Sequence, residues 1–560
     1  MQGVELKPDL HNPLPTGRSD IASVAESDSL QQRLIGQIEA DYDALAYESH
    51  TFPQTHPSKI GAIAKLYGIN VAPVESARVL ELGCASGGNI APIALANPQA
   101  QVVGLDLSRS QILDGKRAIE ALNVRNLTLM QANITALPDD LGQFDYIICH
   151  GVFSWVPKAV QTAIFDTLKR FLAPNGVGFV SYNVYPGWHF RAALRDMMLI
   201  HCEQIKSPQH KVRAARELLN VLVETSGAET LFGKYMRSER DILKNSHDSY
   251  IFHEYLEGVN EPMFFKDWLT QAQSHGLSYL SEAEHFTNYA HWLQDDAKKI
   301  VSTMSDRVMA EQYIDFFRNR TFRQSLLVRA ELAPKVTTDP NALRSLHLAG
   351  RYTEKPADGG KVPFNRFGLT GYVAHNGIDI SITNPIAKAA TQVLTQHWPN
   401  SLSFDELLTA SRSALELLVA NPVETDAVTL CSDLLSMFSW NTVELRTSAL
   451  KLPPVLGDKP KAFAWAQWDS QQGKTRISTL RHDAVGINAA ARIVLALSDG
   501  ARSRDQIADV LFDRLRLGTL TVPDAFAPSA GADDRARWAA LRRFVESCLA
   551  EMRPLGLYVS

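Results

Sequence analysis

The segment ELGCASGGN, residues 81–89, has the residue types of a ligand-binding turn and directly follows a short apolar run. Gly83, Gly87 and Gly88 permit a tight turn and a close approach of a ligand to the backbone. The helix expected after this turn presents free N–H groups that can receive a carboxylate. At the end of the next apolar run, Asp106 can accept hydrogen bonds from both hydroxyls of a ribose. The segment therefore predicts a nucleotide-type cofactor.

These features leave two cofactor classes open. The turn also satisfies a relaxed GxAxxG pattern, and Asp106 lies near the spacing expected for a dinucleotide. Two further residues favour S-adenosylmethionine (SAM). Glu81 precedes the first glycine and suits a cationic ligand such as the α-ammonium group of SAM. Asn133 ends the third apolar run and offers a donor and an acceptor that match adenine.

Five apolar runs alternate with amphipathic stretches between about residues 78 and 185, namely RVLELG, QVVGLDL, LTLMQAN, FDYIICHG and VGFVSYNV. Each run is short enough to be a strand that is buried on both faces. Between them, Ser108 can cap one helix, and apolar residues from Val160 to Leu172 recur at helical spacing. This alternation predicts a parallel sheet with right-handed crossovers, which binds ligands at the carboxyl ends of its strands.

The rest of the chain is less patterned. Residues 1 to about 30 are polar and contain prolines, which predicts a loose arm, and residues 190–335 are mostly helical. Residues 353–368 are rich in Pro, Gly and charge, as in a linker or exposed loop. Residues 379–408 and 484–508 each read as a short strand, a helix and a capped second helix, which predicts a duplicated winged-helix-like unit.

Composition excludes several classes of protein. A length of 560 residues predicts three or four domains. The formal net charge of −5 provides no global positive field, so no nucleic-acid partner is expected. The five cysteines form no CxxC pair, which argues against a disulfide framework or a zinc site and fits a reducing cytosol. Without a signal-peptide core or a long apolar run, we expect a cytoplasmic protein that does not insert into membranes.

The sequence resembles class I SAM-dependent methyltransferases that carry a methyltransferase regulatory domain, a family that includes the rickettsial enzymes that methylate lysines of outer-membrane proteins. The motifs that carry the resemblance are YDALAYESHTFPQTHPSKIGAIAKLYG (42–68), RVLELGCASGGNIAPIALANP, FDYIICHGVFSWVP, VSYNVYPGW, HEYLEGVNEPMFFKDW, GLSYLSEAE and EQYIDFFRNRTFRQSLL (311–327). They span about the first 335 residues. The C-terminal third more weakly resembles the winged-helix-type region of the lysine methyltransferase members.

The resemblance implies an α/β fold: a Rossmann-like class I methyltransferase domain followed by a mostly helical domain and a winged-helix-like C-terminal region. It also implies SAM as methyl donor, S-adenosylhomocysteine (SAH) as product and a protein substrate, with a homodimer as an open possibility. The expected divisions are an N-terminal arm (1–40), a SAM-binding methyltransferase domain (41–190), a helical regulatory or dimerisation domain (191–340) and winged-helix-like domains (341–455 and 456–560).

Methyl transfer from a sulfonium needs alignment, exclusion of water and a surround that tolerates positive charge, which aromatic faces provide. No catalytic residue is assigned, but His150, Trp155, Tyr182 and Tyr185 follow the fourth and fifth runs and are candidates, with packing against the next domain as the alternative for each. Tyr47, from the N-terminal motif, is expected to close over the cofactor. The expected cofactor-binding residues are Tyr47, Glu81, Gly83, Cys84, Ala85, Gly87, Asn89, Asp106, Leu107, Asn133, Ile134 and His150.

The substrate is less determined than the cofactor. A lysine has a pKa near about 10.4 and must lose a proton before attack, and a desolvated aromatic channel would lower that pKa. The sequence CHGVFSW replaces the Asn/Asp-Pro-Pro-aromatic motif of methylases that act on planar nitrogens, which argues against methylation of DNA bases. Two rival hypotheses stay open: a small-molecule methyltransferase, and a SAM- or SAH-binding regulator without turnover.

Two other patterns could indicate binding sites. Arg318, Arg320, Arg323 and Arg329 form a basic cluster that could contact an acidic substrate or a partner protomer, or could be a solvated helix face with local salt bridges. The tetrapeptide HEYL (253–256) lacks the second histidine of HExxH, so no metal site is expected there.

Overall fold

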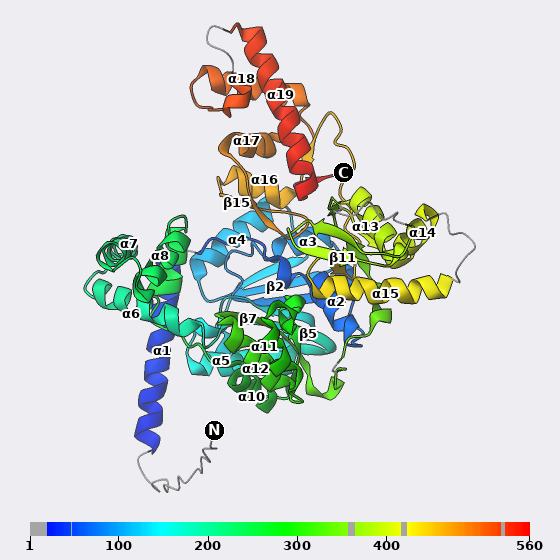
Figure 1. Ribbon diagram of the computed structural model, residues 1–560. Coiled ribbons are helices and arrows are strands. Elements are labelled where there is room, and N and C mark those ends of the chain that lie inside the picture. Colours follow the sequence, from blue (N-terminus) through cyan, green and yellow to red (C-terminus); the bar gives the residue numbers. More distant parts are fainter. Residues whose placement is uncertain (1–19, 46, 336, 357–364, 416–422, 528–531) are drawn as a thin grey trace.

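The computed structural model describes residues 20–45, 47–335, 337–356, 365–415, 423–527 and 532–560. A seven-stranded sheet with the order β3-β2-β1-β4-β5-β7-β6 lies at its centre (Figure 1). Six strands run parallel, and β7 is antiparallel to both of its neighbours. The five strands expected from the apolar runs are confirmed. The strands are β1 (Arg78–Leu82), β2 (Gln101–Asp106), β3 (Leu127–Gln131), β4 (Phe144–Cys149), β5 (Leu172–Asn183), β6 (Leu277–Glu282) and β7 (Phe322–Arg329).

Strands β6 and β7 come from the segment that was expected to be mostly helical. The sheet therefore continues past the boundary predicted at residue 190, and the domain ranges themselves stay predictions. Strand β7 has the sequence FRQSLLVR and is buried along almost its whole length. The Arg, Gln and Ser residues of β7 interrupt its apolar run, so the sequence pattern does not predict a buried strand. A buried arginine is rare unless carboxylates pair with it.

Helices cover both faces of the sheet. On one face, α2 (Pro57–Leu66), α3 (Ala91–Ala96) and α4 (Arg109–Ala121) pack against the strands, and on the other lie α5 (Lys158–Phe171) and α10 (Phe265–Ser274). The predicted cap is present, because the Ser108 hydroxyl accepts a hydrogen bond from the backbone N–H of Gln111. The expected helix between Val160 and Leu172 is α5.

A helical lobe lies beside the sheet, on the left of Figure 1. It has an apolar core of its own. Its elements are α6 (Trp188–Cys202), α7 (Pro208–Thr225), α8 (Leu231–Leu243), α9 (Asp248–Ile251) and the π-helix η6 (Phe252–Leu256). Two further helices, α11 (Asp295–Ser302) and α12 (Arg307–Arg318), precede β7.

The predicted loose arm is wrong for the part of it that the structure describes. Residues Asp20–Ala44 form the helix α1, which projects from the molecule at its N-terminal end (Figure 1). Its C-terminal half carries Ile35, Ile38 and Tyr42 at helical spacing, and these residues line a pocket above the sheet. The polar composition of the segment concealed this short apolar stripe. Residues 1–19 lie outside the described residues.

Two C-terminal units repeat one order of elements: a hairpin, a helix, a capped helix and a long helix. In both, a serine and a residue three positions later form a capping box, Ser403 with Glu406 and Ser503 with Gln506. The predicted strand, helix and capped helix are confirmed in each. The middle unit contains β8 (His347–Ala349), β9 (Tyr352–Glu354), β10 (Thr370–Ala374), β11 (Asp379–Ile382), α13 (Pro385–His397), β12 (Leu402–Ser403), α14 (Phe404–Ala414), α15 (Val423–Ser439) and β13 (Glu444–Arg446). The C-terminal unit contains β14 (Lys461–Ala462), α16 (Ala464–Gln471), β15 (Arg476–Ser478), β16 (Ala484–Gly486), α17 (Ala489–Leu497), α18 (Arg504–Arg516), α19 (Asp534–Met552) and β17 (Tyr558–Val559).

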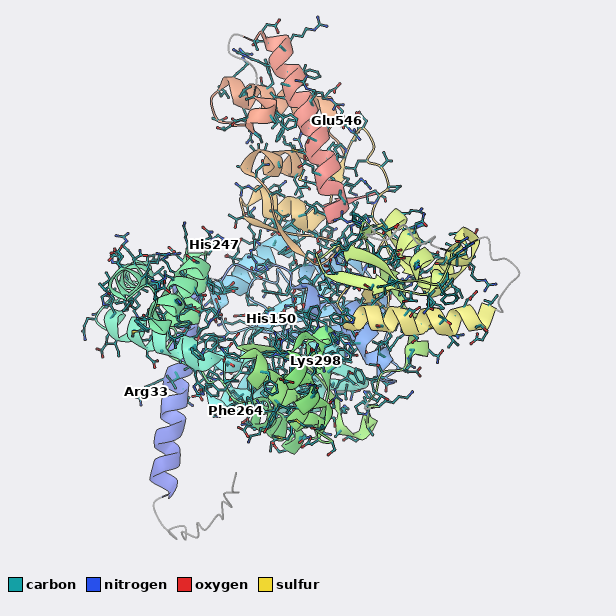
Figure 2. The ribbon with its side chains drawn as sticks, in the orientation of Figure 1. Arg33, His150, His247, Phe264, Lys298 and Glu546 are labelled. Atoms are coloured by element: carbon teal, nitrogen blue, oxygen red, sulfur yellow. The ribbon has the colours of Figure 1, made fainter. Side chains whose placement is uncertain are left out.

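One apolar cluster runs from the sheet face under α2 and α3 through both C-terminal units. The units are therefore packed onto the sheet domain and share its core. Figure 2 shows the chain in the orientation of Figure 1 with its side chains drawn. All five cysteines are buried and free. Part of the predicted linker at 353–368 lies outside the described residues. Within the described ranges, no helix is long and apolar enough to span a membrane.

Candidate cofactor site

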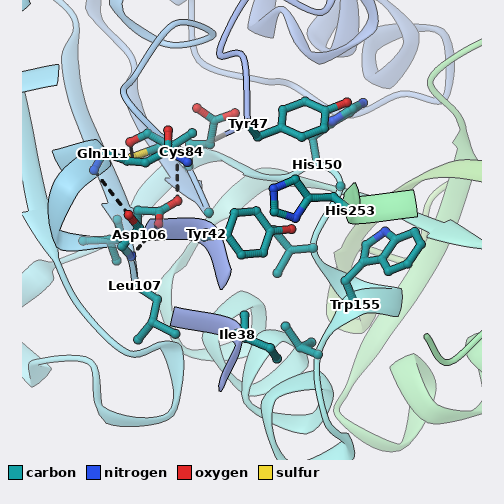
Figure 3. Close-up of a pocket in the computed structure, with 18 of the residues that line it drawn as sticks. Ile38, Tyr42, Tyr47, Cys84, Asp106, Leu107, Gln111, His150, Trp155 and His253 are labelled. Atoms are coloured by element: carbon teal, nitrogen blue, oxygen red, sulfur yellow. Dashed lines mark hydrogen bonds between the residues drawn. The ribbon is translucent and has the colours of Figure 1, made fainter. Parts of the chain in front are cut away.

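A pocket of about 230 Å³ lies at the carboxyl ends of β1, β2 and β4, where a parallel sheet binds ligands. We call it the cofactor pocket. Asp106 and Leu107 lie on one side of it and His150 and Trp155 on the other (Figure 3). Gly87, Tyr182 and Tyr185 do not line it. The sequence-predicted residues that line it are Tyr47, Glu81, Gly83, Cys84, Ala85, Asn89, Asp106, Leu107, Asn133, Ile134, His150 and Trp155.

The three glycines of the cofactor-binding turn, residues 81–89, have different structural roles. Gly83 has a φ of +73°, and a Cβ atom there would lie 2.4 Å from Val152. Gly87 has a φ of +79° and shapes the turn beneath the pocket. At Gly88 a Cβ atom would lie 2.5 Å from the carbonyl oxygen of Ser49. The close approach at Gly88 is thus to protein backbone, whereas a ligand was expected there.

Asp106 holds the turn in place. One carboxylate oxygen accepts from the Ala85 N–H at 2.7 Å, and the other from the Ser108 N–H at 2.8 Å. Burial raises the pKa of Asp106 above its ordinary value, and these backbone hydrogen bonds oppose that rise. Each carboxylate oxygen can accept a second hydrogen bond. The residue can therefore still receive both hydroxyls of a ribose.

Glu81 is 3% exposed and lies under the turn. One of its oxygens accepts from the Asn89 amide at 2.7 Å. The other, Oε2, is buried and has no hydrogen-bond partner in the part of the chain that the structure describes. Burial raises the pKa of Glu81 to about 8. An unpaired buried carboxylate oxygen beside a ligand pocket is costly, and a cationic group would satisfy it.

Asn133 faces the same pocket from the end of β3. Its Oδ1 accepts from the N–H of Thr135 at 3.0 Å and from the Thr135 hydroxyl at 2.9 Å. The acceptor side of the amide is thus engaged with the chain, and the Nδ2 group is the donor that can contact a base. Leu107 and Ile134 line the pocket beside it and offer apolar surface for a flat ring.

The opposite wall is aromatic. The His150 ring stacks on Phe52 with centroids 4.0 Å apart and faces Phe179 at 5.9 Å. Phe322, from β7, meets His150 edge-on at 6.3 Å. Burial lowers the pKa of His150 to about 3, so its imidazole is neutral at physiological pH. Trp155 extends this wall and packs edge-to-face on Trp188 at 5.9 Å. The wall can surround a cation without adding a like charge.

Two of the four catalytic candidates lie away from the pocket. Tyr182 stacks on Trp268 at 4.1 Å and hydrogen-bonds to Ser325 at 3.0 Å, on the face covered by α5 and α10. Successive residues of a strand point to opposite faces, so Tyr182 lies on the other face of β5 from Phe179, whose ring faces His150. Tyr185 lies beyond the strand end and stacks on His189 at 3.9 Å. A strand pattern does not by itself specify which face holds the site.

Elements that sequence reasoning did not assign to the site close the pocket. Residues 48–52, which we call the strap, cross the turn, and Glu48, Ser49, His50 and Phe52 line the pocket. Helix α1 contributes Tyr42, which lies between Asp106 and His253 (Figure 3). The 42–68 motif contained these residues, but it suggested only Tyr47.

The π-helix η6 brings His253 and Glu254 to the pocket. His253 Nε2 lies 2.7 Å from the Leu45 carbonyl and therefore carries a hydrogen, and Nδ1 lies 2.6 Å from the Glu257 carboxylate. The Tyr42 ring stacks on His253 at 4.2 Å. Single π-helical turns are frequent at functional sites. The tetrapeptide HEYL lies in a family motif and lacks the second histidine of a metal site, but neither feature of the sequence assigns these residues to the cofactor pocket.

The basic cluster around β7 is internal. The Arg323 side chain is fully buried and pairs with Glu282 at 2.7 Å, Asp315 at 2.8 Å and Glu311 at 3.0 Å. Arg320 pairs with Asp315 at 3.3 Å. Neither expected role, a substrate-binding patch or a solvated helix face, fits these two arginines. They neutralise carboxylates between β6, β7 and α12.

Comparisons with known proteins agree with this geometry. Residues 79–176 match a model described as a methyltransferase domain, and residues 247–329 match a predicted methyltransferase regulatory domain. Residues 458–557 match the C-terminal winged helix domain of PKMT. The C-terminal unit thus has a family counterpart.

Two uncharacterised proteins of Rickettsia prowazekii are similar in sequence. RP789 is 30% identical over 490 residues, which are 86% of this chain and 87% of RP789. RP028 is 37% identical over 233 residues, which are 41% of this chain and 93% of RP028. The structure of PKMT2 from Rickettsia typhi in complex with AdoHcy is 27% identical and covers 92% of this chain and 100% of PKMT2, with a TM-score of 0.80.

The fit of the pocket and these matches identify the cofactor as SAM. The match to RP789 extends over most of both chains, and the structural match includes the regulatory and winged-helix parts. The chain belongs to the family of class I SAM-dependent methyltransferases with a regulatory domain and a PKMT-type C-terminal winged-helix domain that includes RP789.

Proposed function

We propose that this protein transfers methyl groups from SAM to lysine side chains of a protein substrate. The observation that carries the proposal is the extent of the likeness to PKMT2, a protein lysine methyltransferase by its name. It covers 92% of this chain, so it includes both C-terminal units as well as the cofactor domain. The rival hypothesis is a small-molecule methyltransferase whose additional units mediate oligomerisation.

The pocket residues divide into a binding side and a transfer side. We assign Glu81 to the α-ammonium group of SAM, Asp106 to the ribose and Asn133 to the adenine. When bound, SAM supplies an electrophilic methyl group on a sulfonium. The aromatic wall of Phe52, His150 and Trp155 then faces the acceptor and keeps water from it.

A lysine acceptor arrives as an ammonium and must give up one proton before its lone pair can attack. Glu254 lines the same pocket, and burial raises the pKa of its carboxyl to about 7. Its carboxylate can therefore take the proton from the ammonium near neutral pH. The neutral His150 ring adds no positive charge that would repel the incoming ammonium.

Radiolabelled SAM with purified protein tests the proposal. Cell-envelope proteins, the same proteins with acetylated lysines, and a protein-free metabolite extract would be offered in parallel. We expect label in the untreated proteins only, recovered as methyl-lysine after hydrolysis. Label in the metabolite extract alone would support a small-molecule methyltransferase, and SAH binding without transfer to any acceptor would support a regulator. Either result would overturn the lysine proposal.

A further inference from the structure

A hairpin of the C-terminal unit reaches the back of the cofactor pocket. Strands β15 and β16 are joined by a turn over residues 479–483, which we call the wing turn. His482 stands in this turn with a φ of +70° and is 2% exposed. Its Nε2 lies 2.9 Å from the side-chain oxygen of Asn89, in the cofactor-binding turn. His482 of the C-terminal unit is thus buried directly behind the cofactor-binding turn.

Asn89 lies at the centre of a hydrogen-bond network that fixes the orientation of its side-chain amide. Its oxygen accepts from the Phe52 N–H at 3.0 Å and lies 2.9 Å from His482 Nε2. The Thr55 hydroxyl lies 3.1 Å from the same oxygen and 2.8 Å from the Phe52 carbonyl. Its amide nitrogen donates to Glu81 at 2.7 Å. The Phe52 N–H can only donate, so the amide oxygen must face it, and the His482 Nε2 beside the same oxygen then carries a hydrogen. Asn89 therefore has one orientation, and it fixes one oxygen of Glu81.

The wing turn also holds the strap. The Thr51 hydroxyl donates to the Asp483 carbonyl at 2.8 Å, and Lys474 reaches the Ser49 carbonyl at 3.3 Å. The Ser49 hydroxyl in turn accepts from the Gly88 N–H at 2.8 Å. These contacts place the strap residues that line the pocket. One hairpin thus supports both Glu81 and the strap above it.

We propose that His482 is a positioning residue of the cofactor site, so that the C-terminal winged-helix unit is needed for SAM binding as well as for any contact with substrate. His482 donates to Asn89, Asn89 holds Glu81, and Glu81 is left with Oε2 for the cofactor. Without the His482 donor, Asn89 loses one of the three contacts that orient it, and Glu81 and Phe52 lose part of their support. The inference rests on the proposed assignment of Glu81 to the cofactor.

The middle unit offers a matched control. His375 occupies the equivalent hairpin turn, between β10 and β11. Its ring packs on Trp398 at 4.8 Å, and its Nε2 lies 4.0 Å from Glu444. His375 does not line the cofactor pocket. Replacing it perturbs a comparable hairpin without touching Asn89.

Calorimetric titration of the full chain with SAH is the direct test. We expect His482→Leu to weaken SAH binding by about tenfold, since it removes a buried donor and leaves Asn89 less constrained. His482→Gln should recover most of this loss, because its amide can donate to Asn89. His375→Leu should bind SAH like the wild type. In turnover assays His482→Leu should raise the KM for SAM while kcat at saturating SAM changes by less than about twofold.

Two further variants keep the outcome interpretable. In an Asn89→Ala background His482→Leu should cost little more, because both changes act on one contact. Thr51→Val loosens the strap from the wing turn while leaving His482 in place, and it should weaken SAH binding by about threefold. A folded His482→Leu or Thr51→Val protein, judged by its thermal unfolding, that binds SAH like the wild type would overturn the inference. Wild-type affinity in Glu81→Gln would instead overturn the proposed assignment of the cofactor site.

Discussion

Glu81 has two properties with one cause, its burial: a carboxyl whose pKa is raised to about 8, and an oxygen without a partner among the described residues. The free protein therefore holds Glu81 mainly protonated near neutral pH. A cation binds the carboxylate form, so under the proposed assignment of Glu81 to the α-ammonium group of SAM, binding requires Glu81 to release its proton. Cofactor binding and proton release are then linked at this residue.

This linkage predicts that SAH affinity rises with pH up to about 8 and then levels off. Below that pH, affinity should fall by up to about tenfold per pH unit, because the protonated form must first ionise. Calorimetry in buffers of different ionisation enthalpy measures the released proton directly. In Glu81→Gln the affinity should be lower at pH 9, and its dependence on pH over this range should disappear. An unchanged pH dependence in that variant would contradict the assignment.

Glu254 makes a second prediction at the residue scale. If its carboxylate accepts the proton of the substrate lysine, kcat/KM should increase with pH through about 7, where this group ionises. Glu254→Gln should lower kcat by about 100-fold and remove that limb of the profile. SAH binding should be nearly unchanged, which separates a role in proton transfer from a role in cofactor binding. An equal loss of SAH affinity would argue against the proposed base.

Helix α1 lines the cofactor pocket, and hydrogen bonds anchor it at its C-terminal end. Asp43 accepts from the Ser108 hydroxyl at 2.5 Å and from the Ser110 hydroxyl at 2.6 Å, at the beginning of α4. These hydrogen bonds lower the pKa of Asp43. The Leu45 carbonyl contacts His253 of the helical lobe. Two distant parts of the chain therefore hold α1 over the cofactor.

Asp43→Ala should release α1 from α4. We expect SAH binding to weaken by about three- to tenfold, because the hydrogen bonds to Ser108 and Ser110 are lost. Trypsin should cut faster at Arg33, since the helix opens more often. Asp41→Ala is the control on the same helix, because among the described contacts the Asp41 side chain accepts only from the exposed Gln37. Equal behaviour of the two variants would show that α1 is not anchored through Asp43.

The elements that sequence could predict are those that depend on local pattern. The five parallel strands, the helix capped by Ser108 and the two repeated units each have their signal within a few residues. Which residues of β5 lie near the cofactor pocket depends on tertiary packing. The strand pattern therefore could not show that Tyr182 lies away from the pocket. The contact between Asn89 and His482 joins residues 393 positions apart, and no local pattern carries it.

At the scale of the whole molecule, three parts of the chain meet around one half-buried carboxylate. Glu444, at the start of β13, pairs with Arg481 of the wing turn and lies 3.8 Å from Arg446. Lys59 of α2 and the two arginines lower the pKa of Glu444 to about 2. The cofactor domain, the middle unit and the C-terminal unit each contribute a cation to this junction. It is adjacent to the wing turn that carries His482.

Glu444→Gln should therefore loosen the whole assembly. It leaves three cations without their shared carboxylate, and breaking a buried ion pair costs roughly 3–5 kcal/mol. The folded pKa is depressed, so the stabilisation by Glu444 is present above about pH 4.3, its unfolded value, and is lost as pH falls toward 2.

Calorimetric unfolding of Glu444→Gln at pH 7 should show a lower midpoint and an earlier, separate transition of the C-terminal unit. SAH binding should weaken as well, because the wing turn is displaced with that unit. Glu424→Gln is the control, since Glu424 pairs with Arg344 on the surface, where solvent screens the interaction. A Glu444→Gln protein that unfolds in one transition and binds SAH like the wild type would show that the cofactor site does not depend on this junction.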